Sequence, residues 1–491
     1  MKLSSLIAEA GLHPVRASGE AEVTRIEADS RMVTRGTLFV CMPSANTDSH
    51  SFLQQAKESH AAAAVVHSHD GYQTAKGLGL ATVQLERDQP GFNMHVAILA
   101  RTLLGDPSAK MRVIGVTGTN GKTTTAWMLR DALRTIGRKA SYLGTLGFDP
   151  DGKRRELPNT TPFPVDMWKL LAEARDKGVE DFVMEASSHA LFERRVYGLR
   201  FACGVFTNLS QDHLDYHSDM HDYAEAKRLL FTDFAGSDFR SAINVGDPVG
   251  AEWAKSFRPT VTFGTNGADL TCEPIELSVT SLRLKMDFRG AKQEVGLNVG
   301  GRFNVWNATS ALAALLAMGM EFGEATAAME SVTPVPGRFE SVPTGRAFSV
   351  IVDYAHTDDA LVKLLQSVRE LDPKRIITVF GCGGDRDKSK RPKMAKAATE
   401  NSDFTVITSD NPRTEDPAEI LNDVMKGVRP GAAHEAVIDR REAVKRAVEI
   451  AQDGDVIVIA GKGHENYQII GRTKYPMDDR ELVKFALEAT K

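Results

Sequence analysis

The chain alternates short apolar segments with longer stretches in which apolar residues recur at helical spacing. Each apolar segment is only as long as a strand buried on both faces. In chain order these segments lie at 112–117, 140–144, 181–185, 204–208, 242–245, 261–263, 348–353, 375–380, 404–408 and 455–460. Short apolar strands separated by helices predict α/β architecture, with mostly parallel, doubly wound sheets.

The same alternation begins on a smaller scale before residue 108. Strands are predicted at 37–42, 61–66 and 80–85, with helical stretches near 51–59 and 92–104. A length of 491 residues exceeds what one hydrophobic core holds. Turn-rich breaks occur at Gly105-Asp106-Pro107-Ser108 and at Pro334-Val335-Pro336-Gly337. We therefore expect three domains: a small N-terminal α/β domain (1–108), a central P-loop-type domain with a mostly parallel sheet (109–334) and a C-terminal Rossmann-like α/β domain (335–491).

Composition and charge are those of an ordinary globular protein. Hydrophobic residues make up 42% and charged residues 25%, and the net charge of −5 gives no bulk attraction to nucleic acid. No segment is long enough to span a membrane, and the first ten residues lack the apolar core of a signal peptide. The four cysteines show neither zinc nor disulfide spacing. We expect a cytoplasmic monomer.

One strand-to-helix turn carries the pattern of a phosphate-binding loop. Between the strand at 112–117 and a helical run near 126–133 stands Thr117-Gly118-Thr119-Asn120-Gly121-Lys122-Thr123-Thr124. Glycines let backbone N–H groups approach phosphate oxygens, a lysine reaches the terminal phosphates, and a threonine hydroxyl helps to hold Mg²⁺. The usual spacing requires glycine at 116, where this chain has Val116. The alternative is an ordinary turn with a surface lysine.

Further polar residues follow the predicted strands, at the sheet edge where open α/β sheets bind ligands. Glu185 ends one strand, and His213 follows the next strand along the chain. A carboxylate and a histidine on adjacent strand ends suit Mg²⁺ beside a nucleotide, but histidine is an uncommon Mg²⁺ ligand. An internal hydrogen bond of His213 is therefore an equal alternative. Asn304 and Asn307, near the start of a helix predicted at 308–318, would serve either as helix caps or as ligands of a base or ribose.

In the C-terminal series every strand runs directly into a cluster of polar residues and glycine. The clusters are Tyr354-Ala355-His356, Gly381 to Asp387, Ser409 to Glu415, and Gly461 to Glu465. Any one of them could be a plain surface loop. Four at the carboxyl ends of strands indicate a binding rim.

Together these motifs resemble the Mur ligases, the ATP-dependent amide ligases that build the peptide stem of peptidoglycan. The resemblance covers essentially the whole chain. It rests on TGTNGKTT (117–124), NTTP (159–162), EASSHA (185–190), DHLDYH (212–217), AEAK (224–227), GRFNVWN (301–307), PGRFE (336–340), DYAHT (353–357), GCGGDRD (381–387) and GKGHE (461–465). DNPR at 410–413 is the signature of members that add meso-2,6-diaminopimelate.

The resemblance implies an ATP-dependent ligase in cytoplasmic peptidoglycan precursor synthesis. It would add meso-2,6-diaminopimelate to UDP-N-acetylmuramoyl-L-alanyl-D-glutamate through an acyl phosphate, with Mg²⁺ as cofactor and ATP as co-substrate. The nearest alternative is the same reaction with L-lysine or another diamino acid. Folylpolyglutamate synthetase would share the phosphate loop, but is not expected to carry the N-terminal domain or DNPR. A nucleotide-regulated binding protein without chemistry is disfavoured by the presence of Lys122, Glu185, His213 and Lys227 together.

The resemblance also implies roles for individual residues. Catalysis would use Lys122, Glu185, His213 and Lys227. Lys227 would be carbamylated to N6-carboxylysine and would hold the metal with Thr123, Glu185 and His213. ATP would contact residues 118–124, Asn304, Arg338 and Asp353. The UDP substrate would contact Ser30, Ala45, Asn46, Thr47, Asn159, Thr160, Thr161, Ser187, Glu193 and Arg195. Diaminopimelate would contact Arg386, Asp410, Asn411, Pro412, Arg413, Gly461 and Glu465.

Two expectations concern specificity. The planar fork of Arg413, with Arg386 nearby, suits the carboxylate that lysine lacks, while Asn411, Gly461 and Glu465 would hold the ammonium. The chain departs from the family at Glu193, where glutamine is usual, and at Ser44, Ser49 and Asp358. These departures affect expected contacts with the UDP and sugar, and leave the catalytic set intact.

Overall fold

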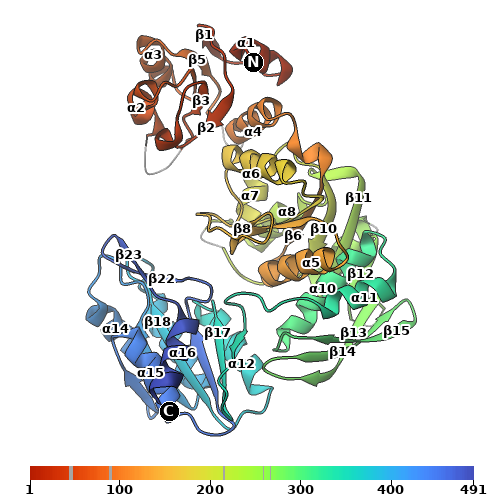
Figure 1. Ribbon diagram of the computed structural model, residues 1–491, viewed down its shortest axis with the longest axis vertical. Coiled ribbons are helices and arrows are strands. Elements are labelled where there is room, and N and C mark those ends of the chain that lie inside the picture. Colours follow the sequence, from red (N-terminus) through yellow and green to blue (C-terminus); the bar gives the residue numbers. More distant parts are fainter. Residues whose placement is uncertain (44–47, 88–90, 214–215, 258, 266, 491) are drawn as a thin grey trace. The chain divides into compact units, whose positions relative to one another are not determined.

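The computed structural model describes every residue except 44–47, 88–90, 214–215, 258, 266 and 491 (Figure 1). The chain divides into two compact units. The first comprises Met1–Leu270 and Ser310–Ala325, and the second comprises Thr271–Thr309 and Thr326–Lys491. The α/β class expected from the sequence is confirmed in both. The division into three domains, with boundaries at 108 and 334, stays a prediction.

The N-terminal part of the first unit is a sheet in the order β1-β5-β4-β3-β2, parallel except for β1. Alternate residues of β4 face opposite sides: Ala63 and Val65 join one hydrophobic cluster, and Ala64 and Val66 join another. Burial on both faces explains why this strand is apolar throughout. The elements are α1 (Leu3–Glu9), β1 (Arg16–Ser18), β2 (Arg25–Glu27), η1 (Ser30–Met32), β3 (Thr37–Val40), η2 (Ser49–Phe52), α2 (Leu53–Glu58), β4 (Ala63–Val66), α3 (His69–Gly77) and β5 (Ala81–Gln84).

The rest of the first unit is built on strands in the order β12-β11-β10-β6-β9-β7-β8, parallel except for the edge strand β8. The strands are β6 (Arg112–Thr117), β7 (Ala140–Gly144), β8 (Gly147–Asp149), β9 (Asp181–Glu185), β10 (Phe201–Phe206), β11 (Ala235–Asn244) and β12 (Val261–Gly264). The helices are α4 (Gly91–Leu103), η3 (Pro107–Lys110), α5 (Lys122–Thr135), α6 (Pro164–Asp176), α7 (Ser188–Phe192), α8 (Met220–Arg228) and α9 (Pro248–Phe257).

This strand order corrects one sequence-based expectation. Glu185 and His213 follow β9 and β10, which are not adjacent, because β6 lies between them. The phosphate loop after β6 is therefore flanked on both sides by the polar strand ends. A sequence gives the positions of strands but not their order across a sheet.

The second unit begins with β13 (Leu270–Leu277), β14 (Leu282–Phe288) and β15 (Ala291–Leu297), of which β14 and β15 pair antiparallel as their alternating pattern predicts. Helices α10 (Phe303–Ala317) and α11 (Phe322–Glu330) follow in the chain, and the end of α10 and the start of α11 belong to the first unit. The helix expected from residue 308 starts five residues earlier, so Asn304 and Asn307 lie inside α10. Asn304 donates to the Gly300 oxygen (2.7 Å) and Asn307 donates to the Asn304 side-chain oxygen (2.8 Å), and neither of these bonds caps a helix N–H group.

The C-terminal sheet has the order β16-β17-β21-β18-β19-β20 and is parallel except for β16. Strand residues of one phase (Ile351, Val458) join a cluster with α12, α13 and α14, and those of the other phase (Val350, Ile457) join a cluster with α15 and α16. The elements are β16 (Glu340–Val342), β17 (Ser349–Asp353), α12 (Asp358–Arg369), β18 (Ile376–Cys382), α13 (Lys390–Asn401), β19 (Phe404–Ser409), α14 (Pro417–Met425), β20 (His434–Ala436), α15 (Arg440–Ile450), β21 (Val456–Ala460), β22 (Tyr467–Ile470), β23 (Thr473–Pro476) and α16 (Asp479–Ala489).

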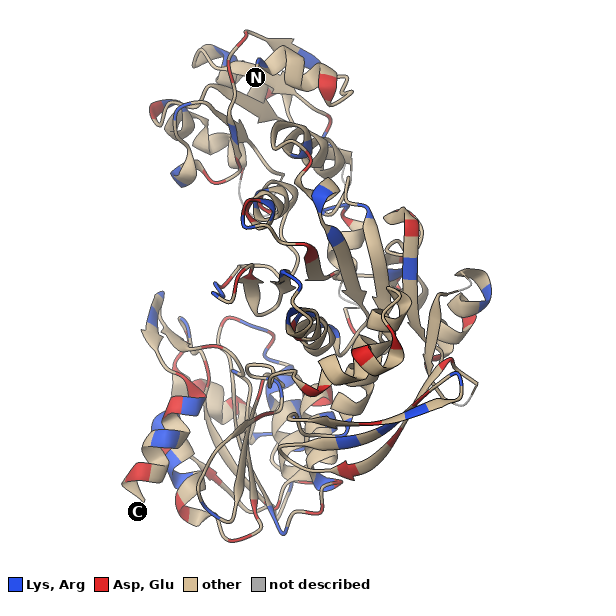
Figure 2. Ribbon diagram, turned by 45° about the vertical axis from the view of Figure 1, so that its right-hand side comes forward, with Lys and Arg blue, Asp and Glu red and all other residues tan. Residues whose placement is uncertain are grey.

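Charged residues of both signs are interspersed along the elements of both units (Figure 2). This matches the mild net charge of −5. Among the described residues, no helix has the length and apolar character that crossing a membrane requires.

Candidate functional site

The phosphate-binding loop connects β6 to α5 and is fixed to the end of β10. Gly118 has φ +145°, and a Cβ there would lie 1.9 Å from the Thr207 hydroxyl oxygen. The Thr207 hydroxyl donates to the main-chain oxygen of Asn120 (2.7 Å), and the Thr119 N–H donates to the main-chain oxygen of Asn208 (2.8 Å). The loop is thus held by its neighbour strand and requires glycine at 118.

Two lysines share an acceptor in this loop. Nζ of Lys122 lies 3.0 Å from the Gly118 oxygen and 2.8 Å from the Thr119 oxygen, and Nζ of Lys227, on α8, lies 2.8 Å from the same Gly118 oxygen. Lys227 is 1% exposed. Burial, and then the charge of Lys122, hold the pKa of Lys227 well below its usual value of 10.5. A lowered pKa favours the neutral amine, which is the form to which CO₂ adds.

Glu185 ends β9 as a fully buried carboxylate with three different neighbours. It accepts hydrogen bonds from the Thr123 hydroxyl (3.0 Å), the Tyr142 hydroxyl (2.6 Å) and the Thr145 N–H (2.8 Å). The predicted metal-binding residues Thr123 and Glu185 are therefore in direct contact.

His213 lies in the loop after β10 and has φ +54°. Its side chain is 43% exposed, 3.5 Å from Asp212, and its ring centroid lies 4.9 Å from that of His189.

The donor set fits a magnesium–nucleotide complex better than an ion bound by protein alone. Among the described residues, no group of three or more histidines, cysteines or carboxylates is arranged to hold a metal. Mg²⁺ commonly takes one or two protein carboxylates together with substrate phosphates and water. Glu185 and Thr123 beside the phosphate loop meet that requirement, and a carbamate on Lys227 would supply a second anion.

The residues expected to line the substrate channel are linked by hydrogen bonds around Glu185. The Thr161 hydroxyl donates to the Glu185 main-chain oxygen (2.8 Å), and Arg195 donates to the Thr161 oxygen (3.1 Å). Arg195 also pairs with Glu193 (2.8 Å). The Thr160 hydroxyl lies 3.2 Å from that of Thr145, and the Ser187 N–H lies 3.3 Å from the Thr161 hydroxyl oxygen.

The remaining predicted substrate contacts lie elsewhere. Asn159 precedes this network in the chain and is half-buried. Ser30 lies in η1 next to the N-terminal sheet and donates to Gln55 (2.8 Å). Ala45, Asn46 and Thr47 lie outside the described residues.

In the second unit, Asn304 and Arg338 line one small hollow together with Val299, Pro334 and Phe339. Arg338 lies over the Tyr354 ring, with its guanidinium carbon 4.8 Å from the centroid. Asp353 at the end of β17 accepts from the N–H groups of Phe339 (2.7 Å) and Ala355 (2.8 Å), and burial raises its pKa. The structure therefore brings Asn304 and Arg338 together in one hollow. Asp353 is linked to them through its hydrogen bond with Phe339, the residue after Arg338.

The residues expected to contact the amino acid gather at the ends of β18, β19 and β21. Arg413 (φ +52°) donates to the Gly384 oxygen (2.8 Å). Its main chain pairs with Ile469 and Gly471 of the β22–β23 hairpin (3.0 and 2.7 Å). Arg386 donates to the oxygen of Asp385 (3.2 Å). Gly461 has φ +112°, and a Cβ there would lie 3.1 Å from a carboxylate oxygen of Asp410. Pro412 is buried between Asn411 and Arg413.

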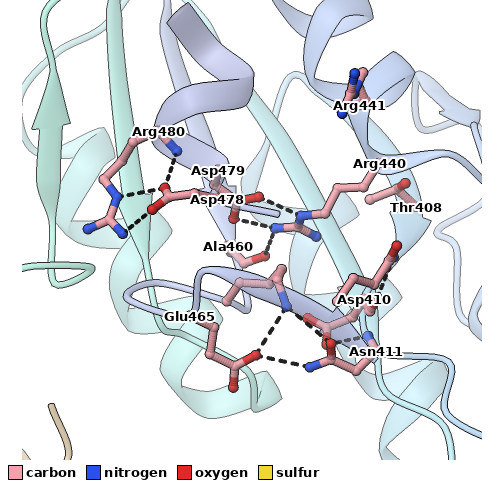
Figure 3. Close-up of polar contacts among 12 residues, drawn as sticks. Thr408, Asp410, Asn411, Arg440, Arg441, Ala460, Glu465, Asp478, Asp479 and Arg480 are labelled. Atoms are coloured by element: carbon pink, nitrogen blue, oxygen red, sulfur yellow. Dashed lines mark hydrogen bonds and ion pairs between the residues drawn. The ribbon is translucent and has the colours of Figure 1, made fainter. Parts of the chain in front are cut away.

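Asn411 and Glu465 face each other in this cluster, as Figure 3 shows. The Asn411 Nδ2 donates to Glu465 Oε2 (3.0 Å). The ammonium of Lys462, which is 0% exposed, donates to Asn411 Oδ1 (3.2 Å) and to Glu465 Oε2 (3.1 Å). The Asn411 oxygen already accepts from Lys462 and from the Ile469 N–H (2.9 Å). The contact of Asn411 with diaminopimelate stays a prediction.

Sequence reasoning did not assign roles to several residues of these networks. Thr207 and Asn208 anchor the phosphate loop, Tyr142 and Thr145 hold Glu185, and Lys462 holds Asn411 and Glu465. The available signals were a tyrosine within a predicted strand and a lysine inside the GKGHE run.

Comparisons with known proteins agree with these motifs over the whole chain. Residues 116–315 match the model of the Mur ligase middle domain, and residues 337–463 match that of the Mur ligase, glutamate ligase domain. The UDP-N-acetylmuramoyl-L-alanyl-D-glutamate–2,6-diaminopimelate ligase of Geobacillus thermodenitrificans is 39% identical over 496 residues, covering 99% of each chain. The enzyme of the same name from Lactiplantibacillus plantarum is 40% identical, covering 95% of this chain and 94% of the relative.

Solved structures give the same picture. A UDP-N-acetylmuramoyl-L-alanyl-D-glutamate–2,6-diaminopimelate ligase is 32% identical, with a TM-score of 0.65 and 95% of both chains covered. Folylpolyglutamate synthase of Mycobacterium tuberculosis, 20% identical with a TM-score of 0.61, covers 75% of this chain and shows a shared fold.

Proposed function

The chain belongs to the Mur ligase family, and on that premise we propose that it is the ATP-dependent ligase that adds meso-2,6-diaminopimelate to UDP-N-acetylmuramoyl-L-alanyl-D-glutamate. The observation that carries this proposal is the 39% identity over 99% of the chain with relatives that bear this activity in their name. The DNPR sequence at 410–413 supports the choice of amino acid.

In the first step, the D-glutamate carboxylate attacks the γ-phosphorus of ATP, and the bond to ADP breaks to leave an acyl phosphate. The attacking carboxylate and the triphosphate are both anionic, so the site must neutralise them. We propose that Lys122 exchanges its bonds to Gly118 and Thr119 for bonds to phosphate oxygens, and that the loop N–H groups bind the remaining charge.

Mg²⁺, when bound, supplies positive charge that offsets the developing charge on the phosphates. We propose that Glu185, Thr123, His213 and the carbamate of Lys227 hold it. The direct contact between Thr123 and Glu185 supports the first two. The lowered pKa of Lys227 supports its reaction with CO₂.

In the second step, the amine of diaminopimelate attacks the acyl carbon and the C–O bond to phosphate breaks. The amine loses a proton, and inorganic phosphate leaves with the bonding electron pair. Acyl phosphates hydrolyse, so the site must exclude water while the amine is positioned.

Discrimination against lysine follows from the carboxylate that only diaminopimelate carries at its distal end. We propose that Arg413 and Arg386 bind that carboxylate, and that Glu465 binds the neighbouring ammonium. Lysine would leave the Arg413 fork unpaired in a desolvated pocket, a cost of roughly 1–3 kcal/mol.

We propose contacts with the other substrates on the same basis. The nucleotide would be bound by Asn304, Arg338 and Asp353. Asn304 and Arg338 line one hollow, and Asp353 accepts a hydrogen bond from Phe339, which lines the same hollow. Thr160, Thr161, Ser187 and Arg195 would bind the UDP substrate, because they are linked to each other and to Glu185. We further propose a monomer that acts in the cytoplasm, consistent with the four free cysteines.

The proposal is tested by incubating the purified chain with ATP, Mg²⁺, UDP-N-acetylmuramoyl-L-alanyl-D-glutamate and diaminopimelate. Mass spectrometry of the products should show the tripeptide nucleotide, formed only when all components are present. Phosphate release without that product would contradict the proposal.

A further inference from the structure

We propose that Lys462 is a positioning residue of the amino-acid site. Its buried ammonium ion holds Asn411 and Glu465 so that Glu465 presents one free carboxylate oxygen to the ammonium of the incoming diamino acid. This inference rests on the proposed function and assigns a role to a residue outside the contacts proposed above.

The first support is the closed set of hydrogen bonds among three side chains. Lys462 Nζ lies 3.2 Å from Asn411 Oδ1 and 3.1 Å from Glu465 Oε2, and Asn411 Nδ2 lies 3.0 Å from the same Glu465 oxygen. Each side chain therefore contacts the other two. Such a closed triangle fixes the rotamers of all three side chains. Side chains at the end of a strand without these bonds would rotate freely.

The second support is the order of burial. Lys462 is 0% exposed, whereas the side chain of Glu465 is 19% exposed. The ammonium of Lys462 is thus shielded from solvent, whereas the carboxylate of Glu465 is partly exposed. Figure 3 shows Glu465 with one carboxylate oxygen joined to this network by dashed lines and the other pointing away from it. The oxygen that points away is the acceptor left for a ligand, because Oε2 already accepts two hydrogen bonds.

The third support is the link from Lys462 to Arg413. Asn411 Oδ1, held by Lys462, also accepts from the Ile469 N–H (2.9 Å). The oxygen of Ile469 in turn accepts from the Arg413 N–H (3.0 Å). Asn411 therefore positions both groups that are proposed to bind the amino acid. It bonds Glu465 directly and is linked to Arg413 through Ile469.

Charge explains why a lysine occupies this place. A buried ammonium is costly unless it is paired, and a carboxylate beside an apolar strand end is costly for the same reason. Lys462 and Glu465 pair at 3.1 Å, so the carboxylate is held in place before the substrate arrives. Removing the ammonium leaves Glu465 without its counter-charge, and the carboxylate is then expected to turn toward solvent.

The test uses the full chain and compares Lys462→Met, which removes the ammonium, with Lys484→Met as a control. Lys484 lies on α16, 57% exposed and paired with Glu481. Phosphate release should show the KM for diaminopimelate raised roughly 10- to 100-fold in Lys462→Met. The KM values for ATP and for the UDP substrate should stay within about twofold of wild type, a split that general loss of structure would not produce.

A double-mutant cycle with Glu465→Gln then tests the pairing itself. If Lys462 acts through Glu465, the KM of the double variant for diaminopimelate should rise less than the product of the two single effects. Lys462→Gln, which keeps a hydrogen-bond donor without the charge, is made in parallel so that the test survives if Lys462→Met does not fold. It should raise the same KM.

Three results would overturn the inference: an unchanged KM for diaminopimelate in Lys462→Met, an equal rise of all three KM values, or independent effects in the cycle. Failure of the proposed function is distinguishable, because the wild-type chain would then form no tripeptide nucleotide with diaminopimelate.

Discussion

Lys122 and Lys227 donate to one and the same acceptor, the main-chain oxygen of Gly118, at 3.0 and 2.8 Å. Burial of Lys227 penalises its charged form, and the ammonium of Lys122 on the same carbonyl oxygen adds repulsion. The lowered pKa of Lys227 follows from both causes. The arrangement favours a neutral Lys227, the form that reacts with CO₂.

Lys227→Met should lower phosphate release on the order of 10²-fold or more, because the variant cannot form the anion proposed to hold Mg²⁺. Wild-type activity should also fall in CO₂-free buffer and return with bicarbonate, whereas the residual activity of the variant should not respond. Lys255→Met, at an exposed position of α9, is the matched control. Full turnover by Lys227→Met would rule out the metal-bridging role.

Gly118→Ala should abolish ATP-dependent turnover while leaving the chain folded. The added Cβ would lie 1.9 Å from the Thr207 hydroxyl oxygen, and φ +145° is unsuited to alanine, so the loop must move away from β10. The measurement is phosphate release together with circular dichroism. Gly77→Ala, where a Cβ meets nothing within 4 Å, should keep wild-type activity; equal behaviour of the two variants would contradict the account of the loop.

Arg440→Met should be among the most destabilising changes in the second unit. Arg440 and Asp479 are both 0% exposed and pair at 2.7 Å, and Arg440 also donates to the oxygen of Ala460 (Figure 3). Removing the arginine leaves a buried carboxylate without its partner, at a cost of about 3–5 kcal/mol.

The unfolding midpoint in urea measures this effect, with Arg446→Met as control. Arg446 pairs with Glu435, but both side chains are well exposed (42% and 37%), so its loss should cost under about 1 kcal/mol. Similar midpoints for the two variants would show that the Arg440 pair contributes little.

Acid should destabilise the N-terminal part of the chain through His67. Burial, and then the charge of His50, lower the pKa of His67 from 6.5 to about 4. Between these values the unfolded chain binds more protons than the folded chain, so the free energy of unfolding falls as pH drops from about 6.5 to about 4.

Urea midpoints at pH 7.5 and 5.0 measure this slope. In His67→Gln the loss between the two pH values should be smaller than in wild type. His13→Gln, at an exposed position, should keep the wild-type slope. An unchanged slope in His67→Gln would assign the acid sensitivity to other groups.

The sequence pattern predicted most strands of both units to within a few residues, because strands buried on both faces are apolar throughout. The phosphate loop was recognisable since its glycines, lysine and threonines are consecutive. Strand order cannot be read from a sequence, so the place of β6 between β9 and β10 is visible only in the structure. The helix expected from residue 308 starts at Phe303, because the glycines at 300 and 301 indicate a turn but do not show where that turn ends.

The chemistry of Asn411 and Lys462 shows why the site could be predicted only in part. Residue type suggests that an asparagine can accept from a ligand, but only the folded chain reveals that Lys462 and Ile469 already occupy its oxygen. The burial of Lys462 depends on β21 lying between β17 and β18, a non-local pairing that no local pattern encodes.

The most direct test of the central claim compares diaminopimelate with L-lysine as the acceptor amine, by phosphate release at saturating ATP and UDP substrate. We expect kcat/KM to favour diaminopimelate by roughly 10²-fold or more, and Arg413→Met to lose most of that preference, because the carboxylate of diaminopimelate loses its guanidinium partner. Equal kcat/KM for the two amino acids in the wild-type chain would contradict the account.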